Sequence, residues 1–99
     1  MSIALRDRHM LFMVIEHFKG RDARPVYARY HKRGRMLPAG LKYMASWTEE
    51  NFGRCFQLME TDDPSTFETW SENWKDLVDF EIVQVMTSEE ASAAVDIQR

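Results

Sequence analysis

His17 is the residue best suited to chemistry in this chain, because an imidazole titrates near neutral pH and can act as an acid, a base or a metal ligand. It lies near the end of an apolar, aromatic and β-branched run, Leu11–Phe18, which is a pattern typical of a strand. We therefore predict His17 as the candidate catalytic residue. The competing interpretation is a histidine that only forms a hydrogen bond at the end of a sheet.

Four further side chains are predicted to line a cavity with His17, provided that the strand registers agree. The end of the first strand should lie beside the start of the third, and the second strand should bring its aromatic residues to the same end. Strand alternation predicts that Trp47 lies on the face of Tyr43. A few polar groups between aromatic walls are typical of small-molecule pockets. The predicted ligand-binding residues are Tyr43, Trp47, Cys55 and Gln57.

Nucleophilic and metal chemistry are less well supported by these residues. Cys55 and His17 can in principle form a thiolate pair, but no helix amino terminus or orienting group is evident beside them. A single cysteine can form neither an internal disulfide nor a multi-cysteine zinc site. Glu16 and His17 should point to opposite faces, and His17 with Glu81 offers too few ligands. We predict no metal and no cofactor.

A basic segment gives a second candidate site. Lysine and arginine dominate from Lys19 to Lys42, where Asp22 is the only acid, whereas acids dominate from Thr48 onward. Within this segment, Lys32 and Arg35 are three residues apart on a predicted helix and can together hold a carboxylate or a phosphate. A solvated helix face, or pairing of oppositely charged surfaces, explains the same charges.

The elements that position these residues alternate in a recognisable order. After the first strand, Pro25 begins a helix that is predicted to end near Pro38. Strands are predicted at 41–48 and 54–60, and the polar, glycine-containing loop 49–53 joins them as a hairpin.

The second half of the chain continues the alternation of helix and strand. Asp63 and Pro64 begin a second helix, and a fourth strand is predicted at 80–86. Thr87 and Glu90 form a capping box for a short terminal helix through Val95. The second helix should cover the sheet with a buried apolar stripe of Phe67, Trp70, Trp74 and Leu77.

This order predicts an α+β fold of ferredoxin-like βαββαβ type. Its four-stranded antiparallel sheet should have the spatial order four-one-three-two, with two helices on one face. The first strand is apolar on both sides, and the helices can bury only one of them. Because soluble monomers rarely expose an apolar patch of several hundred Å², we expect a homodimer that pairs through its sheet faces.

Composition supports one folded domain, since 44% of the residues are hydrophobic and 29% are charged. Residues 1–9 are predicted to be a flexible N-terminal extension and residues 10–99 a single domain. The longest apolar run is too short to span a bilayer and no signal peptide is evident, so we expect a cytoplasmic protein without a membrane partner. The net charge of −3 argues against a nucleic-acid partner.

Four segments carry a family resemblance: MLFMVIEHFKG, RGRMLPAGLKY, SWTEENFGRCFQLMETDDP and WKDLVDFEIV. Together they resemble a family of small bacterial proteins of unknown function within the dimeric α+β barrel superfamily. The resemblance covers residues 10–86 and implies the same fold and a dimer. That superfamily includes cofactor-independent monooxygenases acting on aromatic substrates, haem-degrading enzymes and small ligand-binding or structural proteins, so it does not fix an activity.

Three functional hypotheses follow. The first is a homodimeric protein that binds a small molecule in a pocket near the end of the sheet. The alternative is a cofactor-independent monooxygenase-like enzyme that uses His17 as acid or base on an aromatic substrate. The third is an interaction or structural protein without a pocket. The residues alone do not decide whether the protein is an enzyme.

Overall fold

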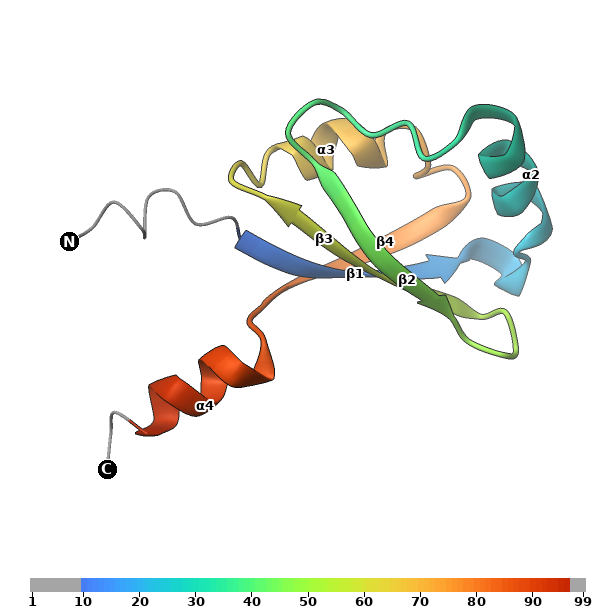
Figure 1. Ribbon diagram of the computed structural model, residues 1–99. Coiled ribbons are helices and arrows are strands. Elements are labelled where there is room, and N and C mark those ends of the chain that lie inside the picture. Colours follow the sequence, from blue (N-terminus) through green and yellow to red (C-terminus); the bar gives the residue numbers. More distant parts are fainter. Residues whose placement is uncertain (1–9, 97–99) are drawn as a thin grey trace.

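The computed structural model describes residues 10–96, so the predicted N-terminal extension lies outside the described residues. The chain forms one four-stranded sheet in the order β2-β3-β1-β4, with every neighbouring pair antiparallel (Figure 1). This is the predicted strand order, and the α+β ferredoxin-like fold class is confirmed. The strands are β1 (Met10–Phe18), β2 (Lys42–Thr48), β3 (Arg54–Thr61) and β4 (Val78–Val85).

The helices α2 (Arg24–Arg33) and α3 (Thr66–Ser71) both lie on one side of the sheet, which we call the helix face (Figure 1). A short 3-10 turn, η1 (Lys19–Arg21), connects β1 to α2. The last helix, α4 (Ser88–Asp96), lies apart from the sheet. It begins with the predicted capping box, because Thr87 and Glu90 exchange hydrogen bonds of 2.9 and 3.0 Å.

Both main helices are shorter than the sequence predicts. α2 ends at Arg33 because Gly34 adopts a φ of 69°, a left-handed conformation that glycine tolerates and that stops a helix. α3 ends at Ser71, and turns continue the chain to Trp74, whose amide bonds the Ser71 carbonyl. The predicted apolar stripe is nevertheless buried between these helices and the sheet, apart from Leu77, which is only partly buried.

The core occupies the helix face of the sheet. Alternate residues of β1 point into it, and the ring of Phe12 meets the ring of Phe67 edge to face at a centroid distance of 5.0 Å. Val14 is completely buried at the centre of the sheet. The other main contributions to this core come from Phe18, Val26, Met59, Trp70, Trp74 and Val78.

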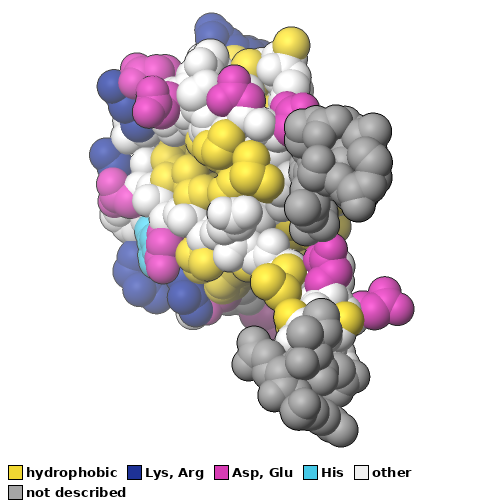
Figure 2. Space-filling view, turned by 90° about the vertical axis from the view of Figure 1, so that its left-hand side faces the viewer, with side chains coloured by type: hydrophobic (Ala, Val, Ile, Leu, Met, Phe, Trp, Pro, Cys, Tyr) yellow, Lys and Arg dark blue, Asp and Glu magenta, His cyan; other side chains and the backbone are white. Residues whose placement is uncertain are grey.

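The opposite side of the sheet, which we call the open face, is also apolar. No helix of residues 10–96 covers it, and Trp47 and Val83 remain 57% and 42% exposed. In the view of Figure 2, hydrophobic side chains reach the surface in several places, with one group near the centre. The strand registers assign these apolar residues to the open face: Leu11, Met13, Ile15, Ala45, Trp47, Phe56, Leu58, Val83 and Val85.

Candidate functional site

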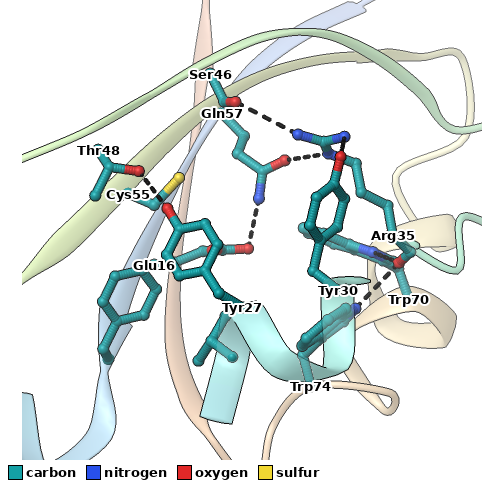
Figure 3. A pocket seen from close by; sticks show the side chains of 12 residues that line it. Glu16, Tyr27, Tyr30, Arg35, Ser46, Thr48, Cys55, Gln57, Trp70 and Trp74 are labelled. Atoms are coloured by element: carbon teal, nitrogen blue, oxygen red, sulfur yellow. Dashed lines mark hydrogen bonds between the residues drawn. The ribbon is translucent and has the colours of Figure 1, made fainter. Parts of the chain in front are cut away.

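A cavity of about 80 Å³ lies between the helix face and the helices (Figure 3). Aromatic rings from β1, α2 and the α3 region form its walls, and polar side chains from β1, β2 and β3 reach into it. This mixture of a few polar groups with aromatic walls is the usual composition of a small-molecule pocket. The cavity is lined by Glu16, Phe18, Val26, Tyr27, Tyr30, Arg35, Ser46, Thr48, Cys55, Gln57, Trp70 and Trp74.

Glu16 is the acidic residue of this cavity. Strand alternation places it on the helix face together with Val14 and Phe18, and only 6% of it is exposed. Its Oε2 accepts a hydrogen bond of 2.6 Å from Nε2 of Gln57. Burial raises the pKa of Glu16 to about 7, and the opposing effects of the Gln57 hydrogen bond and of the Arg35 charge are smaller.

Arg35 is the basic residue of the cavity and follows the end of α2. Its backbone carbonyl accepts hydrogen bonds from the indole N–H groups of both Trp70 and Trp74, at 2.9 and 3.1 Å. The next residue, Met36, has a φ of 60°, so the chain turns sharply here. Two buried indoles therefore fix the backbone from which the guanidinium extends into the cavity (Figure 3).

The guanidinium of Arg35 is held by weak neutral contacts. Nε donates to Oε1 of Gln57 at 3.2 Å, and the terminal nitrogens donate to Tyr30 and Ser46 at 3.3 and 3.5 Å. The Cζ atom lies 3.6 Å from the centroid of the Tyr43 ring, which is a close cation–π contact. Gln57 thus connects Arg35 to Glu16 through its two amide atoms (Figure 3).

The opposite wall of the cavity is neutral. The hydroxyl groups of Tyr27 and Thr48 share a hydrogen bond of 2.6 Å. Cys55 is 7% exposed, and burial together with the nearby Glu16 raises the pKa of its thiol. The thiol therefore stays protonated near neutral pH, which does not favour a nucleophilic role.

The structure divides the five residues that the sequence predicted for one cavity. Cys55 and Gln57 line the cavity, and Tyr43 lies on the same face against Arg35. His17 and Trp47 lie on the open face, so the prediction of a single cavity formed by all five is corrected. The cause for Trp47 is a β-bulge in β2 between Tyr43 and Ala45, which reverses the alternation and separates Trp47 from Tyr43.

His17 pairs with Arg54 at the end of the sheet, and its Nε2 lies 3.4 Å from Oε1 of Glu81. Its side chain is 45% exposed. Because Cys55 points to the helix face, these two residues cannot form the thiolate pair that the sequence left open. Within residues 10–96, no group of three or more His, Cys, Asp or Glu side chains could hold a metal ion.

The predicted pair of Lys32 and Arg35 is also separated. Lys32 is exposed on α2, whereas Arg35 lies beyond the end of that helix and its side chain enters the cavity. The three-residue spacing places two side chains together only on a continuous helix, which Gly34 interrupts.

Glu16 is the charged cavity residue that sequence reasoning missed. Phe12, Val14 and Phe18 lie on one face of β1, and Glu16 falls on the same two-residue period. An acid at a predicted core position is a signal for a buried carboxyl group. Arg35 was predicted as an anion-binding residue, but its place in the cavity depends on where α2 ends and was not predicted.

A comparison with protein families matches residues 10–98 to DUF3303, a domain of unknown function. The chain belongs to this family. No curated protein and no solved structure matches the chain. The description of DUF3303 assigns no activity, so the geometry of the cavity is the basis for a function of this DUF3303 protein.

Among residues 10–96, no helix is long and apolar enough to cross a membrane.

Proposed function

We propose that this DUF3303 protein is a homodimer that binds a small molecule in the cavity around Glu16, Gln57 and Arg35. The observation that carries the proposal is the chain of hydrogen bonds from Arg35 through Gln57 to Glu16 inside an aromatic-walled cavity. Tyr43, Cys55 and Gln57 keep their predicted roles in this proposal, and Glu16 and Arg35 join them.

Burying a carboxyl group and a guanidinium costs free energy that well-packed apolar side chains at the same positions would not cost. Glu16 receives a hydrogen bond from Gln57 alone among the described residues, and burial raises its pKa to about 7. Ionisable groups with strongly shifted pKa values in a cavity are common at functional sites. Ligand binding is therefore the function that best explains the buried Glu16 and Arg35.

The homodimer is supported by the open face. Its apolar residues run across all four strands without a cover from residues 10–96, and a second copy of the same face is complementary to it in chemistry. We infer the face-to-face pairing of two sheets found in dimeric α+β barrels. His17 and Trp47 would then lie at the subunit interface, and not in the ligand cavity.

An enzyme that uses the same cavity is the second candidate, although the aromatic substrate of the monooxygenase-like hypothesis is larger than the cavity volume of about 80 Å³. The observation that favours it is the pKa of about 7 for Glu16, which suits a general acid or base near neutral pH. In this cavity Glu16 takes the role that the sequence assigned to His17. A Glu16→Gln variant that binds a ligand but does not convert it would support the enzyme over the binding protein.

The test of the proposal is native mass spectrometry of the purified protein after incubation with a library of small metabolites. We expect a dimer that retains a small compound. A Cys55→Met variant should lose the compound, because the longer side chain fills part of the cavity. The matched control is Leu58→Met, which changes the open face of the same strand and should leave ligand retention unchanged.

Two results would contradict the proposal. Equal retention by wild type and Cys55→Met would place the compound outside this cavity. A monomer at micromolar concentration would contradict the homodimer, whatever it binds.

A further inference from the structure

The contacts of Arg35 differ from those of the other arginines with side-chain hydrogen bonds in residues 10–96. Arg24, Arg29 and Arg54 each bind a carboxylate through two nitrogens at 2.8–3.0 Å. Arg35 has no carboxylate within ion-pair distance among the described residues, and its three hydrogen bonds to neutral groups measure 3.2–3.5 Å. Charge-assisted bonds to a carboxylate are typically shorter, at about 2.7–2.9 Å.

The guanidinium of Arg35 also has hydrogen-bond donors that these contacts do not use. A guanidinium has about five N–H donors, and the three contacts use one hydrogen on each nitrogen. One hydrogen therefore remains on each terminal nitrogen. Two remaining donors are the number that the two oxygens of a carboxylate can accept.

The size and walls of the cavity limit the ligand. An apolar cavity of roughly 150 Å³ holds benzene, and this cavity has a volume of about 80 Å³. That proportion gives roughly three non-hydrogen atoms inside this volume, so the ligand is about the size of a carboxylate group with at most a short chain. The rings of Tyr30, Trp70 and Trp74 provide apolar contact for the part of the ligand that is not charged.

We propose that the ligand is a small organic carboxylate with a short apolar body, held by Arg35 while Glu16 is protonated. The inference rests on the proposed function, since it names the ligand class of the same cavity. An amine would place a second cation beside Arg35, and a neutral amide would leave the charge of Arg35 without a counterion.

Protonation of Glu16 matters because an ionised carboxyl group would repel the ligand carboxylate. The groups that face Glu16 are Gln57 and Cys55 from β3, Tyr27 and Tyr30 from α2, and Arg35 from the following loop. Arg35 is the only permanent charge among them. Burial raises the pKa of Glu16 to about 7, so the proton is present below pH 7 and is lost above it. Binding should be about tenfold weaker at pH 8 than at pH 6.

The experiment is an NMR titration that follows the Nε–Hε signal of Arg35. The probes are acetate, propionate and butyrate, with propionamide and propylamine as matched neutral and cationic controls, each at pH 6 and pH 8. We expect propionate to shift the signal and the two controls to leave it unchanged. Glu16→Gln should bind propionate equally at both pH values, because glutamine carries no titratable proton.

Variants distinguish binding at Arg35 from general electrostatic attraction of a carboxylate to a basic surface. Arg35→Gln should abolish propionate binding, and Arg35→Lys should weaken it at least tenfold while keeping the charge. Arg33→Gln is the matched control, because Arg33 is exposed on α2, and it should bind as wild type does. Circular dichroism of each variant checks that it folds.

The outcomes distinguish this inference from the proposed function. If propionamide or propylamine binds as well as propionate, or if binding does not weaken from pH 6 to pH 8, the carboxylate inference is wrong and the cavity remains a ligand site. If no carboxylate binds but a neutral compound from the metabolite library does, the inference is also wrong. If no compound of any class binds in the cavity, the proposed function fails as well.

Discussion

Arg35 and Glu16 lie at opposite ends of one side-chain amide. Gln57 accepts a hydrogen bond of 3.2 Å from Arg35 through Oε1 and donates one of 2.6 Å to Glu16 through Nε2. The orientation of this amide follows from its partners, because a guanidinium can only donate. A change at either end of the amide should therefore be measurable at the other.

Replacing Gln57 with leucine should raise the pKa of Glu16 above its value of about 7, because the lost hydrogen bond lowers that pKa. The free energy of unfolding at pH 8 should fall by about 1–3 kcal/mol, since an ionised carboxylate is left without its donor. The measurements are a ¹³C NMR titration of the carboxyl group and urea unfolding. Gln84→Leu, at an exposed position of β4, is the control. An unchanged Glu16 titration would show that the bond does not exist in solution.

Glu16→Gln should stabilise the protein in alkaline but not in acidic solution. The folded-state pKa of Glu16 lies above its ordinary value of 4.5, so ionisation costs stability progressively between pH 4.5 and 7. At about 1.4 kcal/mol per pH unit, the variant should gain roughly 3 kcal/mol over wild type at pH 8 and nothing below pH 4. Urea unfolding across this pH range measures the difference. A gain that does not depend on pH would contradict the buried carboxyl group.

Two adjacent residues of β4 test the open face. Val83 and Ile82 are 42% and 39% exposed but point to opposite faces of the sheet. Val83→Asp should convert the dimer to a monomer, because it buries a charge between two apolar faces. Ile82→Asp, on the helix face, should leave the dimer intact. Sedimentation velocity measures both. If both variants remain dimeric, the open face is not the interface.

Trp74 should help to position Arg35 in the cavity. Trp74→Phe removes one of the two indole donors to the Arg35 carbonyl, whose bond measures 3.1 Å. The expected loss is about 1 kcal/mol in the free energy of unfolding, together with weaker ligand binding, because the guanidinium is less well positioned. Trp47→Phe, on the open face, should leave ligand binding unchanged. Chemical unfolding and ligand titration measure the two effects.

The topology was predictable because it depends on patterns that many residues share. An apolar, aromatic and β-branched run indicated β1, and the spacing of Phe67, Trp70 and Trp74 indicated the buried stripe even though α3 itself is short. The site was less predictable because single local features decide it. One extra residue in β2 moves Trp47 away from Tyr43.

One other local feature also placed the site differently from the prediction. The positive φ of Gly34 ends α2 early and sends Arg35 into the cavity, and neither consequence is visible in the spacing of charged residues. Glu16, in contrast, falls on the two-residue period of β1 that includes Val14. The sequence therefore indicated Arg35 as an anion-binding residue without its place in the cavity, and Glu16 was accessible through strand alternation.

The most direct test of a ligand site in this cavity uses the three tryptophans of the chain. Trp70 and Trp74 line the cavity, whereas Trp47 lies on the open face. In a two-dimensional ¹H–¹⁵N NMR spectrum, a bound small molecule should shift the indole signals of Trp70 and Trp74 and leave that of Trp47 in place. A bound compound that shifts Trp47 alone, or none of the three, would contradict the proposed site.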